Sequence, residues 1–310
     1  MNEGILRRIE RRTGVAGLAE LLAERLSPGD LQSLLLEVYA QRAGKLSEVE
    51  LLERRQQSRF CQNAPVAPGA LLELKQLWLR LLDKGFEALE LSPLAPLGSC
   101  SVLAPVHQNK LVSCTRNLEV AGDPSNQLAL ECALRRRDGQ PEVHLSACQR
   151  VVRAQALPGP ECSAHFTLLA LASASGTPEG FEESQLRRHL NFHLRFLSQA
   201  LPGEPLTLRW SPKTPATLVD RVEGWLREQE FSFHSGWLES VEAANYYLGV
   251  RFKLWAGSDE VGDGGTTDWC RRLLQSRGER LLISGLGLER VALRREKKRP
   301  RGGGGKPRGP

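Results

Sequence analysis

Residues 281–291, LLISGLGLERV, combine a short apolar run with two closely spaced glycines and an Arg. They predict a strand, a turn built on Gly285 and Gly287, and a helix opened by Glu289 and Arg290. Because glycine has no side chain, a flat ligand can lie against this backbone with Arg290 beside it. Tight strand-to-helix turns also need glycine for their dihedral angles alone, so the stretch needs support from elsewhere in the chain.

Two earlier segments give that support. Residues 82–93, LDKGFEALELSP, predict a helix that ends at a glycine, then a strand closed by a proline. Residues 150–172, RVVRAQALPGPECSAHFTLLALA, predict two strands joined by a Pro/Gly loop. Arg153 lies at the end of the first of these strands and Phe166 at the start of the second.

In this order the three segments resemble the three motifs of class II aminoacyl-tRNA synthetases, and most closely those of histidyl-tRNA synthetase and its paralogues. Residues 123–137, DPSNQLALECALRRR, resemble the stretch between the first two motifs, where the family has a glutamate opening a helix. Residues 245–252, NYYLGVRF, resemble the family's tandem-tyrosine loop, and residues 262–269, GDGGTTDW, its Gly-Gly-x-x-Asp segment. The likeness covers roughly residues 70–298, and five ordered matches are more specific than any one alone.

The fold class that follows is α+β, with a mainly antiparallel sheet flanked by helices and an N-terminal helical extension. The extension is predicted at 1–68, the synthetase-like catalytic core at 69–298 and a disordered basic Gly/Pro tail at 299–310. Helices are predicted at 70–83, 125–137, 181–200, 216–229, 267–276 and 287–297, and strands at 86–91, 109–116, 143–154, 165–174, 206–210, 247–255 and 280–284.

The amino-acid composition is that of a globular protein and not of a membrane-spanning one. Of the 310 residues, 41% are hydrophobic and 25% charged, which is ordinary for a globular protein. No apolar run approaches the roughly 20 residues that span a bilayer, and no signal peptide is evident, so we expect a cytoplasmic protein without membrane contact. The net charge of +6 comes from the C-terminus, since residues 294–310 carry eight Lys or Arg and one Glu. This tail predicts weak, salt-dependent contact with nucleic acid, although a tail that only aids solubility is equally common.

Cysteines and histidines give no metal signal. The seven cysteines are widely spaced without a CxxC pair, and we expect buried, apolar thiols, with a reactive Cys162 as the alternative. His189 and His193 lie four residues apart on a predicted helix and could share a metal ion. No third ligand is evident, so we expect solvent-facing histidines and no metal site.

The resemblance implies a role for each candidate residue. Arg153 would contact the α-phosphate of ATP, while Phe166 and Arg290 would cover the two faces of the adenine. Gly285 and Gly287 would leave room for the nucleotide, and Mg²⁺ would accompany its phosphates. The substrate would be an amino acid or other small carboxylic acid, held by Glu131, Tyr246 and Tyr247.

The chain also departs from the family. Leu168 and Ala172 stand where the family has Gln and Glu, and Glu242 stands where it has an essential arginine. We therefore do not expect histidine as the activated substrate, because Leu168 and Ala172 cannot pair with its ammonium or imidazole groups and Glu242 reverses the charge of the arginine. Only 20 residues follow Arg290, too few for an anticodon-binding domain.

Two functions remain open. One is an ATP-dependent ligase that activates an amino or other carboxylic acid as an acyl adenylate. The other is a non-catalytic paralogue resembling the regulatory subunit of ATP phosphoribosyltransferase. The resemblance implies a homodimer in either case.

Overall fold

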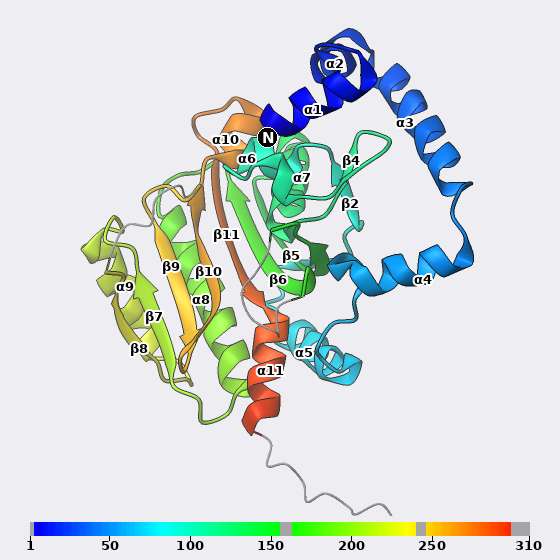
Figure 1. Ribbon diagram of the computed structural model, residues 1–310. Coiled ribbons are helices and arrows are strands. Elements are labelled where there is room, and N and C mark those ends of the chain that lie inside the picture. Colours follow the sequence, from blue (N-terminus) through cyan, green and yellow to red (C-terminus); the bar gives the residue numbers. More distant parts are fainter. Residues whose placement is uncertain (1–2, 156–162, 240–245, 299–310) are drawn as a thin grey trace, which may run out of the picture.

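The computed structural model describes residues 3–155, 163–239 and 246–298 (Figure 1). Its largest feature is an eight-stranded sheet in the order β1-β5-β6-β11-β10-β9-β7-β8. The pairings are antiparallel except β1–β5 and β7–β8 at the two edges, which confirms the expected mainly antiparallel α+β fold. The strands are β1 (Glu87–Leu89), β5 (Glu142–Val152), β6 (His165–Ser175), β11 (Arg280–Gly287), β10 (Asp259–Thr267), β9 (Arg251–Ala256), β7 (Leu206–Trp210) and β8 (His234–Trp237).

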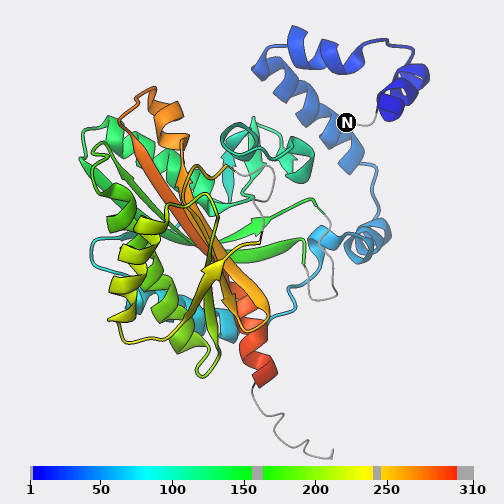
Figure 2. The same cartoon turned by 90° about the vertical axis from the view of Figure 1, so that its left-hand side faces the viewer.

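Helices cover the central strands on both faces. Side chains alternate across a strand, so Leu169 and Leu171 enter the core beneath α8, while Ala170 and Ala172 enter a second core beneath α7. The first face is packed by α5 (Pro68–Leu81), α8 (Phe181–Ala200), α9 (Ala216–Arg227) and α11 (Leu288–Lys298). The second carries α7 (Pro124–Arg137) and α10 (Trp269–Leu274) (Figure 2).

The start of α7 is set by its local sequence. Asp123 has extended backbone angles and accepts a hydrogen bond from Ser125 N at 2.9 Å, which makes it the N-cap. Pro124 follows at the first helical position, where its missing N–H costs no hydrogen bond. This cap fixes Asp123 at one end of the second core.

A small sheet lies between α5 and α7 in the chain. It has the order β2-β4-β3, with β2 (Leu94–Pro96), β3 (Ser113–Cys114) and β4 (Leu118–Val120), and is joined by α6 (Ser99–Leu103) and η3 (Gln108–Lys110). Glu119 on β4 is fully buried, and its carboxylate accepts from the backbone N–H groups of Gly98 and Cys100 and from the Gln108 amide. These bonds satisfy a buried charge that would otherwise be costly, and they hold α6 against the sheet.

The N-terminal segment is helical, as expected, and projects from the core (Figures 1 and 2). None of its helical residues is buried, and Ser47 forms a capping box with Glu50 at the start of α4. The division at residue 68 stays a prediction. The elements are α1 (Glu3–Thr13), α2 (Leu18–Glu20), η1 (Leu21–Arg25), α3 (Pro28–Ala43), α4 (Glu48–Gln57) and η2 (Arg59–Cys61).

Several local predictions are wrong. The strand expected at 109–116 is divided between η3 and β3. Strand β10 is not predicted, because its glycines lack the apolar side chains whose alternation marks a buried strand. His189 and His193 are fully buried beneath the sheet instead of facing solvent, since serines on β6 and β11 provide their hydrogen bonds.

The cysteines follow expectation only in part. Four of the described thiols are buried, but Cys61 is exposed and Cys114 is half-buried, while Cys162 lies outside the described residues. Within the described ranges, no helix combines the length and the apolar character that a membrane crossing requires.

Candidate functional site

Strand register brings the candidate residues to one face of the sheet. Gly285 on β11 pairs with Asp263 on β10 and with Ala170 on β6, and Gly287 pairs with Leu168. Because directly paired residues point to the same face, all of these positions lie on the face that carries α7. A side chain at Gly285 would approach Leu169 O to 2.9 Å, so packing also requires that glycine. A Cβ at Gly287 would meet its nearest atom, in the Arg290 side chain, at 3.6 Å, which is ordinary van der Waals contact, so packing does not require glycine there.

Arg153 and Phe166 lie together where β5 ends and β6 begins. The Arg153 Nε donates to Gly122 O at 2.9 Å, and its Nη2 donates to Asp123 Oδ2 at 2.8 Å. Its guanidinium carbon lies 5.2 Å from the centroid of the Phe166 ring. The hydrogen bonds orient a charged group that remains partly exposed, and the ring stabilises it through a cation–π contact.

Arg290 lies at the same end of the sheet, in the first turn of α11. Its side chain is exposed, and Nη1 donates to Glu260 O at 2.7 Å. The preceding residue, Glu289, is buried and accepts from Thr167 N at 2.6 Å, which ties α11 to the strand segment beside Phe166. Burial raises the pKa of Glu289, although this hydrogen bond opposes the shift. The sheet therefore brings Arg290 to the end occupied by Arg153 and Phe166, and direct contact is seen between the latter two.

A cavity of about 120 Å³ adjoins Arg153 beneath α7. Tyr246 and Trp269 form part of its wall, with their ring centroids 5.0 Å apart, and the Tyr247 ring lies 4.6 Å from that of Tyr246. Arg153 thus borders both the cavity and the Phe166 ring. The polar side chains that line the cavity are Lys110, Asp123, Asn126, Arg153 and Gln155.

A carboxylate lies behind the tyrosine pair. Tyr247 is hydrogen-bonded to Tyr246 and to Asp263 on β10. Burial raises the pKa of Asp263 to about 6, the Arg251 charge opposes this rise, and the Asp123 charge adds to it. Two acidic groups near one cavity favour a ligand with a cationic end.

Glu131 lies on the helix predicted at 125–137. It lies in the middle of α7 and accepts from Arg135 Nε at 2.7 Å, and Arg135 also contacts Glu87 on β1. The acidic residue that opens this helix is Asp123, which lines the cavity. Its sequence signal is Asp-Pro-Ser, an N-cap followed by proline at the first helical position. The role of Glu131 in holding the substrate stays a prediction.

Three positions mark the chain's departures from the family. Leu168 is half-buried on the site face, whereas Ala172 is fully buried in the core beneath α7, where it cannot reach a ligand. Glu242 lies outside the described residues. Cys100, Asn126 and Trp269 also line the cavity, although no sequence pattern singles out Cys100 or Asn126.

The described side chains do not form a metal site of their own. The described residues contain no group of three or more His, Cys, Asp or Glu side chains placed to hold an ion. Mg²⁺ commonly uses one or two carboxylates together with substrate phosphates. Any Mg²⁺ here would therefore depend mainly on phosphate oxygens.

Solved structures show which fold this is. No protein-family model matches the chain, and no curated protein matches it. One match is a protein from Bacillus halodurans C, described as an ATP phosphoribosyltransferase regulatory subunit/histidyl-tRNA synthetase. Its TM-score is 0.57 at 12% identity, over 77% of this chain and 83% of that one. Apo histidyl-tRNA synthetase of S. aureus matches with a TM-score of 0.55 at 12% identity, over 77% and 70%. Pyrrolysyl-tRNA synthetase of Desulfitobacterium hafniense matches with a TM-score of 0.50 at 15% identity, over 86% and 79%. The chain has the fold of a class II synthetase-like core.

Proposed function

We propose that the protein binds ATP and a small carboxylic acid, most suitably an amino acid, and joins the acid to AMP as an acyl adenylate. One observation carries this proposal: the oriented Arg153 guanidinium contacts the Phe166 ring and also borders the cavity. A single fixed charge between a stacking surface and a cavity suits a reaction between a nucleotide phosphate and a bound acid.

The candidate residues would have different roles in forming the acyl adenylate. Arg153 would neutralise charge that builds on the α-phosphate oxygens as a carboxylate oxygen bonds to phosphorus and pyrophosphate leaves. Phe166 and Arg290 would position the adenine, and Gly285 and Gly287 would let it approach the backbone. Tyr246 and Tyr247 would border the acid. Mg²⁺, held by the phosphates, would offset their charge.

The alternative is a non-catalytic regulatory protein with the same ligands. The apolar Leu168 opposite Gly287 favours it, because this side chain adds no polar contact at the site face. Either function would suit a cytoplasmic homodimer, which light scattering after gel filtration would test. Nucleic-acid contact through the basic tail is a further proposal, and it predicts binding that weakens with salt.

Pyrophosphate exchange with a panel of amino acids, combined with thermal unfolding in the presence of MgATP, tests the proposal. We expect MgATP to raise the unfolding temperature of the wild type, and Arg290→Ala to lose this stabilisation. Arg137→Ala, which removes an exposed arginine at the end of α7, is the matched control and should keep it. Stabilisation with exchange supports the ligase, stabilisation without exchange supports the regulatory protein, and the absence of both overturns the nucleotide site.

A further inference from the structure

A short segment of the N-terminal extension, residues 59–62, which we call the strap, is hydrogen-bonded to the β5–β6 hairpin. The Arg59 guanidinium donates to the carbonyl oxygens of Ala154 and Gln155, at 3.2 Å for Gln155. A charged donor makes these bonds stronger than those of a neutral donor. Because Ala154 directly follows Arg153, this first anchor holds the backbone next to the residue proposed to contact the α-phosphate.

The second anchor lies on the other strand of the hairpin, at His165. Its Nδ1 lies 2.9 Å from Arg150 Nε and 2.7 Å from Arg150 Nη2. Because a guanidinium has only donors, Nδ1 accepts, and the neutral ring carries its proton on Nε2. Nε2 therefore donates to the Gln62 carbonyl oxygen, which is 2.6 Å away. Since His165 directly precedes Phe166, this anchor joins the strap to the residue proposed to stack on the adenine.

The same path of polar contacts continues to α11. Arg150 Nη1 lies 3.5 Å from Glu289 Oε1, and the buried Glu289 also accepts from Thr167 N at 2.6 Å. Glu289 directly precedes Arg290. Each of the three side chains proposed to contact the nucleotide therefore has a chain neighbour that is joined to the strap, directly or through Arg150.

The strap is also tied to the rest of the extension through Gln62. Its side-chain amide lies within hydrogen-bond distance of three backbone carbonyl oxygens at the end of α4, those of Arg55, Gln56 and Ser58, at 3.0, 2.9 and 3.3 Å. The last carbonyl groups of a helix have no partner within it, so this amide closes the end of α4. The backbone oxygen of the same residue receives the bond from His165, so the hairpin and α4 meet at one residue.

We propose that the strap positions the nucleotide site, with His165 as the positioning residue that joins the N-terminal extension to the hairpin. This role rests on the proposed function for the identity of the site, and it goes further by giving the extension a part in ligand binding. The anchors are partly open to water, so their loss should change global stability little. Coupling between two sites is reciprocal, so a bound nucleotide should also hold the strap more firmly.

Titration calorimetry with MgATP on the full chain tests this role. His165→Phe keeps a ring but removes both hydrogen bonds, and should weaken MgATP binding about fivefold or more. His165→Gln again offers an N–H donor and an oxygen acceptor, and should restore most of the affinity. His234→Phe, at an exposed position on β8, is the matched control and should bind as the wild type does. We expect equal urea midpoints for all four proteins.

Hydrogen exchange measured by mass spectrometry follows the strap directly. In peptides that contain residues 59–62, we expect faster exchange in His165→Phe than in the wild type, and slower exchange in the wild type when MgATP is added. Unchanged exchange in His165→Phe, or equal MgATP affinity in the wild type and His165→Phe, overturns the role of the strap and leaves the nucleotide site standing. If the wild type does not bind MgATP, the nucleotide site fails and the role of the strap fails with it.

Discussion

Acidification should destabilise this protein through two histidines buried between α8 and the sheet. His189 and His193 are fully buried, and Ser284 Oγ lies 2.7 Å from a ring nitrogen of each. Ser173 Oγ continues the chain at 2.9 Å from His189 and 2.9 Å from His144. Because the Ser284 hydroxyl has one proton, it can donate to only one of its two rings and accepts from the other. Neutral rings satisfy this arrangement, and an added proton has no buried counter-charge.

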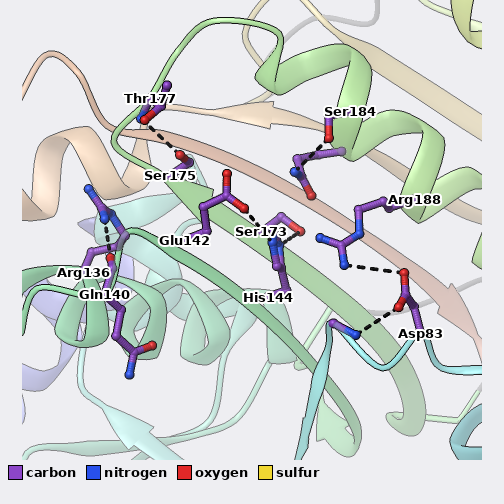
Figure 3. Close-up of polar contacts among 12 residues, drawn as sticks. Asp83, Arg136, Gln140, Glu142, His144, Ser173, Ser175, Thr177, Ser184 and Arg188 are labelled. Carbon is purple, nitrogen blue, oxygen red and sulfur yellow. Dashed lines mark hydrogen bonds and ion pairs between the residues drawn. The ribbon is translucent and has the colours of Figure 1, made fainter.

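Charged side chains surround His144, the outermost histidine of this series of hydrogen bonds (Figure 3). His144 lies 3.4 Å from Glu142, and Arg188 on α8 contacts Asp83 across the same edge. The pKa of His144 is lowered first by burial and then by the Arg188 charge, while Glu142 and Asp83 oppose the shift. These groups therefore cannot compensate a proton on the two deeper rings.

The magnitude follows from proton linkage. Burial lowers the pKa of His193 to about 3 and holds that of His189 well below its usual value near 6.5. Below pH 6.5 the unfolded rings bind protons that the folded rings do not, so each ring costs about 1.4 kcal/mol of stability per pH unit. Two rings lose about 4 kcal/mol between pH 6.5 and 5. Asp263 acts in the opposite sense, because its pKa in the folded protein is about 6 and the folded state therefore binds a proton that the unfolded chain does not. This proton adds about 1.4 kcal/mol to the free energy of unfolding between pH 6 and 5, which leaves a net loss of about 3 kcal/mol.

Urea unfolding at pH 7 and pH 5 measures this loss. We expect the wild type to lose about 3 kcal/mol, and His193→Gln, which cannot take up a proton, to lose about 2 kcal/mol less than the wild type. His234→Gln, at an exposed position on β8, is the control and should match the wild-type pH dependence. A wild-type loss below about 1 kcal/mol, or an unchanged pH dependence in His193→Gln, would refute the reasoning.

Three further predictions follow from single contacts. Arg59 of η2 donates to the carbonyl oxygens of the two residues that follow Arg153. Arg59→Ala should therefore reduce the thermal stabilisation by MgATP while changing the unfolding free energy by less than about 1 kcal/mol. Full retention of the MgATP effect would rule out this positioning role. A side chain at Gly264 would lie 2.5 Å from the Phe252 ring, so Gly264→Ala should cost about 1 to 3 kcal/mol in urea unfolding, and a stability equal to the wild type would contradict the packing. Binding of an amino acid should weaken as the pH falls through about 6, because a proton on Asp263 removes negative charge near the ammonium group; titration calorimetry at pH 7 and 5 would show constant affinity if Asp263 plays no part.

Local sequence determined much of the secondary structure. Helix α8 and strand β7 have the predicted bounds, because the apolar periodicity of each is continuous and ends at glycine or proline signals. Residues 281–291 pass from strand to helix as predicted, but Gly285 and Gly287 belong to β11 and α11 follows directly, so the prediction of a turn built on the two glycines is wrong. The contact between Arg153 and Phe166 also follows from sequence, since the two residues flank one hairpin loop and Arg153 follows two residues after Val151, which pairs with Phe166.

Long-range strand pairing decided the rest. The place of Asp263 opposite Gly285 depends on the register of β10 against β11, and glycine-rich strands carry little apolar pattern from which to read that register. The burial of His193 depends on Ser284, a partner 91 residues away whose position no helical periodicity reveals. The sequence by itself therefore determined most of the helices and several of the strands, because these depend on neighbouring residues. Only the tertiary structure decided which polar groups meet in the interior, because that depends on how distant segments pair.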